Sequence, residues 1–135
     1  MTNLLPDFTA ALADRWTGIY LRFLALVLFY GALMHVGNIV GWSGRPWLET
    51  PLLWRVMDGV LLTFDLIVGV GLWLKQPWSP IALVVGLIAL QGIPYTLFRQ
   101  YFVETPEQAA TLNSLLGTEA ILLAILLGLL VWPRA

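Results

Sequence analysis

The stretch from Pro51 to Leu74 most constrains how this chain can fold, because it is 24 residues long, almost entirely apolar and interrupted by two aspartates. At about 1.5 Å per residue, a helix of this length crosses the hydrocarbon core of a membrane. Asp58 and Asp65 are seven residues apart, so both lie on one face of that helix. An acidic side chain at the bilayer centre costs roughly 2.5–3.5 kcal/mol. We therefore expect this face to lie against protein or water, not lipid.

The composition extends this expectation to the whole chain. Of its 135 residues, 59% are hydrophobic and 11% are charged, whereas a soluble domain carries about 25% charged residues. The net charge is −1 without any basic run, which excludes a nucleic-acid-binding surface. The chain has no cysteine, which excludes disulfides and thiolate-ligated metal or iron–sulfur sites. The sequence therefore predicts an integral membrane protein.

Four apolar segments predict an all-α fold, an integral membrane four-helix antiparallel bundle that forms a single domain over residues 1–135. The expected spans are residues 21–40, 52–74, 80–98 and 114–131. Three dipeptides are typical of helix starts, because the hydroxyl can cap the helix and proline suits its first position. They are Thr50-Pro51, Ser79-Pro80 and Thr105-Pro106. Gly37 and Gly41 form a GxxxG pattern, which favours close helix approach, and Pro94 is expected to kink the third span.

Residues 6–20 predict a short amphipathic helix that leads into the first span, since Phe8, Leu12 and Trp16 are four residues apart. Acidic residues near the start argue against a cleaved signal peptide, so we expect the first apolar segment to be retained as a span. Both termini are expected to be cytoplasmic, because their side of the spans carries four basic residues and the other side three. A bacterial inner membrane fits these features, and so does a thylakoid-type membrane.

The polar residues of the four spans gather in the half of the membrane nearer the first and third loops. The candidate cofactor-binding residues are His35, Asn38, Asp58, Gln91, Tyr95 and Glu119. Asp65 lies deeper. Polar groups that several helices direct into one half of a bundle are typical of ligand and cofactor sites. The structural alternative is that Arg55 pairs with Asp58, and that the amides only join helices by hydrogen bonds.

His35 is the only histidine of the chain, and several cofactors could use it. It could ligate the metal of a haem or a chlorophyll-type pigment, relay protons, or donate a hydrogen bond to a quinone carbonyl. One histidine cannot supply the paired axial ligands of a b-type haem within this chain. A separate metal site built from His35, Asp58 and Glu119 is not expected.

Two stretches of the chain resemble the DoxX-like small four-span bacterial membrane proteins. They are Arg22 with the FYGALMH segment that follows it in the first span, and DLIVGVGLWLKQPWSP, which turns from the second span into the third. The resemblance implies a quinone-containing membrane and a link to electron transport, and it carries over no catalytic residue.

These features favour a small accessory or assembly subunit of a larger membrane redox or photosynthetic complex. Its expected partners are membrane lipids and larger membrane-protein subunits or further copies of itself. The aqueous segments are too short for an independent soluble catalytic site, which argues against an enzyme. One alternative is a quinone- or lipid-binding redox membrane protein that uses the polar cluster. The other is a small homo-oligomeric transporter in which Asp65 and Glu119 line the path.

Overall fold

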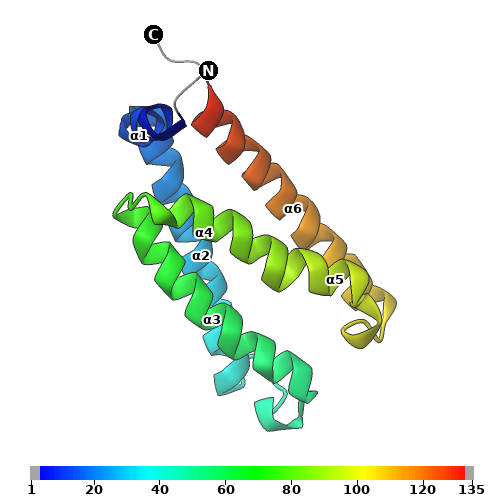
Figure 1. The fold of residues 1–135 in the computed structure, drawn as a ribbon. Coiled ribbons are helices and arrows are strands. Elements are labelled where there is room, and N and C mark those ends of the chain that lie inside the picture. The colour runs from blue at the N-terminus through cyan, green and yellow to red at the C-terminus, as the bar shows by residue number, and fades with distance from the viewer. Residues whose placement is uncertain (1–3, 133–135) are drawn as a thin grey trace.

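A computed structural model describes residues 4–132 and is built almost entirely of helices (Figure 1). In chain order the elements are α1 (Leu4–Ala13), α2 (Arg15–Val40), η1 (Trp47–Glu49), α3 (Leu52–Trp73), α4 (Trp78–Leu87), η2 (Ile88–Gly92), α5 (Ile93–Leu97), η3 (Arg99–Tyr101) and α6 (Pro106–Val131). Elements η1 and η3 are 3-10 helices, and η2 is a π-helical turn. No strand occurs between residues 4 and 132, so the all-α prediction is confirmed for this part of the chain.

Four helical stretches are long and apolar enough to cross a membrane, namely residues 15–40, 52–73, 78–97 and 106–131. The third stretch combines α4, η2 and α5. The first stretch begins before the expected position 21, and the last helix begins at Pro106, its predicted start, ahead of the expected span 114–131. Capping residues set both starts. The Asp14 side chain accepts from the backbone N–H groups of Trp16 and Thr17 at 3.1 and 3.3 Å. This cap separates α1 from α2, so the single helix predicted over residues 6–20 is wrong beyond Ala13.

The helices α2 and α3 pack side by side as an antiparallel pair (Figure 1). After a short turn, the chain reverses direction and α4 packs against α3. The last helix, α6, contacts α1 and the first half of α2, where the Tyr20 hydroxyl donates to the Leu122 carbonyl at 2.6 Å. Beyond this point α6 runs away from α2 toward the third loop (Figure 1). The four long helices therefore meet closely at the end that holds both termini and separate toward the other end.

Two apolar clusters hold the helices together at opposite ends. The larger cluster joins α1, α2, α3, α4 and α6 near the termini, and its fully buried members include Leu21, Leu72, Leu83 and Leu126. The second cluster joins the start of α3 to α5 and α6, and it contains Met57, Leu61, Tyr95, Phe102 and Leu112. The space between these two clusters is where the polar residues lie.

Glycines allow the helices to approach closely at several of these contacts. A β-carbon on Gly86 of α4 would collide with the Phe64 ring of α3, and one on Gly69 of α3 would lie 2.6 Å from the Phe29 ring of α2. Such distances are too short for real side chains, so these positions require glycine for packing and not for backbone conformation.

The predicted hydroxyl caps were correct in one of three cases, although α3 begins at residue 52 as expected. Thr105 caps α6 as expected: its hydroxyl accepts from the Gln108 N–H at 3.2 Å, and the Gln108 side chain returns to the Thr105 backbone in a capping box. The Thr50 and Ser79 hydroxyls instead donate backward to the carbonyls of Trp47 and Gln76. The prediction was wrong there because a hydroxyl can also bond to the turn that precedes it.

Two predictions about helix irregularity have different outcomes. Gly41 takes no part in helix approach, because it ends α2 in the left-handed conformation with φ 86°. The GxxxG interpretation was therefore wrong. At Pro94 the expected disturbance takes the form of the π-helical turn η2, in which the Ile93 N–H donates to the Ile88 carbonyl. Proline has no N–H to donate, and its side chain displaces the preceding turn of the helix. This explains why the hydrogen bond at Ile93 spans five residues instead of four.

We predict that Gly86→Ala lowers the free energy of unfolding by about 1–3 kcal/mol, because the added methyl group overpacks the contact with Phe64. Thermal unfolding in detergent measures the effect. The matched control is Gly117→Ala on α6, where no heavy atom lies within 4 Å of the new methyl group. Equal melting temperatures for the two variants would contradict the α3–α4 packing described.

Candidate functional site

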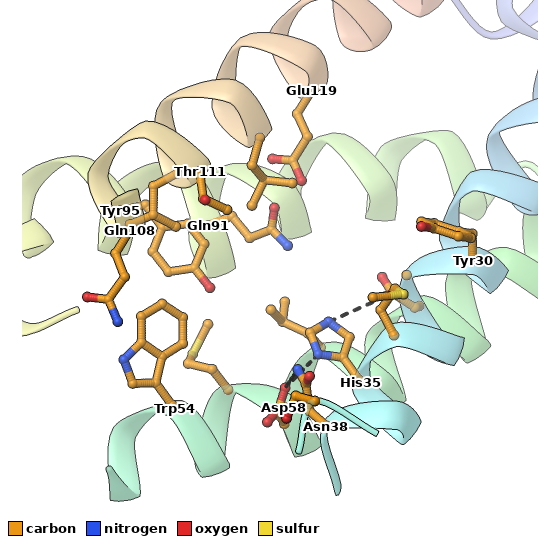
Figure 2. Close-up of a pocket in the computed structure, with 18 of the residues that line it drawn as sticks. Tyr30, His35, Asn38, Trp54, Asp58, Gln91, Tyr95, Gln108, Thr111 and Glu119 are labelled. Atoms are coloured by element: carbon orange, nitrogen blue, oxygen red, sulfur yellow. Dashed lines mark hydrogen bonds and ion pairs between the residues drawn. The ribbon is translucent and has the colours of Figure 1, made fainter. Parts of the chain in front are cut away.

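A cavity of about 780 Å³ lies between the helices, and α2, α3, α6 and the segment α4–α5 all contribute to its wall. The six candidate residues predicted from the sequence all line it: His35, Asn38, Asp58, Gln91, Tyr95 and Glu119. Asp65 lines it too. They lie in two groups on facing walls, with the first three on the α2–α3 side and the others on the α4–α6 side (Figure 2). The structure thus brings the predicted residues together, and their role in binding remains a prediction.

Asp58 is the centre of the first group. Its Oδ1 lies 2.8 Å from His35 Nδ1 and accepts from Asn38 Nδ2 at 3.1 Å (Figure 2). Its Oδ2 accepts from the Trp47 indole at 2.9 Å. These three partners come from α2 and from η1 in the first loop. One carboxylate in α3 therefore ties the end of α2 and the first loop to α3, and these bonds compensate its burial.

His35 lies between both aspartates of α3, as their seven-residue spacing allows. Its Nε2 is 3.9 Å from Asp65 Oδ2, while Nδ1 bonds to Asp58. The neutral tautomer with a proton on Nδ1 donates to Asp58 and leaves no N–H on Nε2. The Asp65 carboxylate also approaches α2 closely, because a β-carbon on Gly31 would lie 2.8 Å from its Oδ2. Gly31 therefore leaves the space that Asp65 occupies.

A haem or pigment metal on His35 would have to bind Nε2, because Nδ1 bonds to Asp58. Metal-bound histidines usually donate the second ring N–H to a carboxylate, a role that Asp58 could take. A metal on Nε2 would then lie beside the Asp65 carboxylate, whose Oδ2 is 3.9 Å from this nitrogen. Among the described residues, no group of three histidine, aspartate or glutamate side chains is arranged to hold a metal ion.

Gln91 and Glu119 form the polar part of the opposite wall. Gln91 is buried and belongs to the π-helical turn η2, and its carboxamide faces the Glu119 carboxylate of α6 (Figure 2). With its nitrogen toward Glu119, the amide donates to both carboxylate oxygens. The π-helical turn ahead of Pro94 therefore contains Gln91, the residue that pairs with α6. Single π-helical turns occur frequently at functional sites.

Aromatic rings form the wall nearer the third loop. Trp54 and Tyr95 are stacked with centroids 6.3 Å apart, and both meet Phe102 edge-on at 5.3 and 5.1 Å. Trp54 and Tyr95 also line the cavity, and Tyr95 is 3% exposed. Offset and edge-on pairs of this kind stabilise contacts beyond the apolar area they bury. The ring cluster fixes the distance between α3 and α5 at this end.

The sequence interpretation did not identify Trp47 as a partner of Asp58. No spacing rule connects a loop tryptophan to Asp58, because the connection depends on how the first loop folds back. Arg55, which was expected to pair with Asp58, and Arg99 of η3 both bond elsewhere. Arg55 Nε donates to the Thr50 carbonyl at 3.2 Å, and Arg99 bonds to the Tyr95 carbonyl and the Asn113 side chain. The suggested Arg55–Asp58 pair is therefore absent from the described residues.

The cavity opens in two directions. Between α2 and α6, the lining residues Tyr30, Met34 and Leu115 are 65, 49 and 36% exposed. At the loop end, the lining includes Arg45 and Glu104, which are exposed. The inner end closes near Leu28 and Leu122, beside the larger apolar cluster. A molecule in the cavity would thus have apolar surroundings on one side and water at the loop end.

We predict that Asp58→Ala releases the first loop, because three donors lose their acceptor. A buried donor without a partner costs about 1–3 kcal/mol. Hydrogen exchange of residues 41–51 should become faster, and the melting temperature should fall. Glu49→Ala, which removes an exposed carboxylate from the same loop region, is the control and should change neither. Unchanged exchange in Asp58→Ala would show that this network does not hold the loop.

Comparison with known proteins adds one finding to this geometry. Neither the curated proteins nor the solved structures contain a match to the chain. The model of a family of unknown function, DUF6163, matches residues 15–132, which covers all four long helices and every residue of the cavity wall named above. The chain belongs to this family of unknown function, DUF6163.

Proposed function

We propose that this chain is an integral membrane protein that binds a lipophilic small molecule with a polar head group in the cavity between its helices. The observation that carries the proposal is the cavity itself. Ligand sites typically enclose about 300–1,000 Å³, with mostly apolar walls and a few polar groups that orient the ligand. This cavity, of about 780 Å³, has two polar groups on facing walls, further polar side chains at its loop end, and leucine, methionine and aromatic side chains between them.

The membrane setting rests on the surface of the helices. Large apolar side chains are exposed along all four long helices, among them Phe23, Ile67, Val85 and Ile121 at 48–64%. Lipid tails can cover such residues, and water cannot do so without a large free-energy cost. We place the four helices across the bilayer as a bundle that is open on one side. A bacterial inner membrane with both termini in the cytoplasm remains our expectation.

The openings of the cavity support a ligand that comes from the bilayer. Tyr30, Met34 and Leu115 border the gap between α2 and α6 at the depth where lipid tails would lie. A lipophilic molecule could enter there and place its polar head beside the polar side chains. Quinones and lipids are candidates on the strength of the DoxX-like resemblance.

A second candidate function follows from α6. Its most apolar 18-residue window has only 6% of its residues buried, against 22–33% for the other three stretches. An accessory subunit that places α6 against a helix of a larger complex would have this property. Transport is less favoured, because the inner end of the cavity closes at the apolar cluster around Leu28 and Leu122.

Binding of lipophilic probes to the purified protein in detergent tests the first proposal. We suggest decylubiquinone, tetraphenylphosphonium and tetraphenylborate as neutral, cationic and anionic probes in isothermal titration. We predict that at least one binds with 1:1 stoichiometry, and that Leu115→Trp, which fills the cavity, weakens this binding at least tenfold. Leu127→Trp is the matched control, since Leu127 is 48% exposed and lies outside the cavity wall.

Two results would contradict the proposal. Failure of all three probes to bind is one, and unchanged binding to Leu115→Trp is the other. In the second case the probe would occupy the outer surface of the helices, as a detergent molecule does.

A further inference from the structure

The side chains that line the cavity carry an excess of negative charge. Five carboxylates line it: Asp58, Asp65, Glu104, Glu107 and Glu119. The basic groups in the wall are Arg45 and the His35 imidazole. Arg45 lies at the loop end, where its guanidinium donates to the Glu49 carbonyl at 3.2 Å. Away from the loop end, the cavity lining among the described residues contains two carboxylates, Asp65 and Glu119. It contains no lysine or arginine there that would balance their negative charge.

Asp65 is the group that most needs a partner. Its side chain is 8% exposed, and it accepts no hydrogen bond from the described residues. His35 Nε2 lies 3.9 Å from its Oδ2, which is beyond hydrogen-bond distance. His35 already bonds to Asp58. A buried carboxylate is costly unless it is paired, so a cation on the cavity side would stabilise the ionised form of Asp65.

Hydrogen-bond donors for a neutral acceptor are scarce in the same region. A quinone carbonyl would need a free N–H or O–H in the wall. The Asn38 amide and the His35 Nδ1 are bonded to Asp58, and the Gln91 amide is bonded to Glu119. The donors of Asn38, His35 and Gln91 thus already have partners, and the Tyr95 hydroxyl is a further donor that faces the cavity (Figure 2).

Aromatic rings add a second feature that suits a cation. Trp54 and Tyr95 line the cavity between its loop end and the carboxylates. The face of an indole or phenol ring attracts a cation, by about 0.5–2 kcal/mol. Weakly hydrated organic cations gain most from such rings, since they lose little hydration when they leave water.

We infer that the ligand of this cavity is a lipophilic cation, a substituted ammonium or similar onium group with apolar substituents. Its charge would lie between Asp65 of α3 and Glu119 of α6, and its apolar part along Leu61 and Leu115. This inference rests on the proposed function, of which it specifies the ligand class. It also explains why two acids face one cavity without a lysine or arginine between them.

The test compares tetraphenylphosphonium with tetraphenylborate, which have the same tetrahedral shape and opposite charge. We expect the phosphonium to bind the purified protein at least tenfold more tightly than the borate or decylubiquinone. Asp65→Asn and Glu119→Gln should each weaken phosphonium binding at least tenfold and leave borate binding unchanged or stronger. Glu49→Gln, an exposed carboxylate outside the cavity wall, is the control and should bind like the original chain.

The outcomes separate this inference from the proposed function. Binding of the borate or decylubiquinone as tightly as the phosphonium, with loss of that binding in Leu115→Trp, would overturn the cation and retain the cavity as a binding site. Absence of any binding would overturn both. Undiminished phosphonium binding in Glu119→Gln would also overturn the inference, and because this variant lies on α6 it serves even if Asp65→Asn fails to fold.

Discussion

Burial of Asp58 and Asp65 within an apolar helix is the constraint on which the remaining structure depends. Each carboxylate would be costly against lipid tails, so α3 must turn that face toward polar groups. His35 and Asn38 of α2, with Trp47 of the first loop, supply donors to Asp58. Gly31 leaves space for Asp65. The register between α2 and α3 follows, because a rotation of either helix would separate these partners.

The same constraint explains why a cavity exists. The leucine-rich cluster near the termini and the aromatic cluster around Tyr95 hold the helices together at two ends. Between these clusters, α6 diverges from α2 (Figure 1). The polar faces of α3, of the π-helical turn and of α6 then border a common space that their own side chains do not fill. Asp65 has only a distant partner there, at 3.9 Å from its carboxylate. This is the physical basis of both the proposed function and the inferred cationic ligand.

Much of this arrangement could be predicted from periodicity. The seven-residue spacing of Asp58 and Asp65 predicts their common face, and the apolar segments predict the four long helices. All six candidate residues line the same cavity for that reason. Two kinds of contact could not be predicted. One depends on how a loop folds, and the other depends on which of two nearby backbone groups a side chain bonds to. Trp47 reaches Asp58 through the folded first loop, Thr50 and Ser79 bond backward, and Gly41 ends α2 instead of packing. The sequence also does not predict the gap between α2 and α6, because the apolar residues of α6 could face either protein or lipid.

The most direct test of the cavity is thiol labelling, which is clean because the chain has no cysteine. Thr118 lines the cavity, and Ala120, two residues further along α6, is exposed outside its wall. Thr118→Cys and Ala120→Cys therefore place a thiol at nearly the same depth on different sides of one helix. In lipid vesicles we predict that a charged methanethiosulfonate reagent modifies the cysteine at position 118 much faster than that at position 120. Equal protection of both cysteines would contradict a polar, water-accessible cavity between the helices.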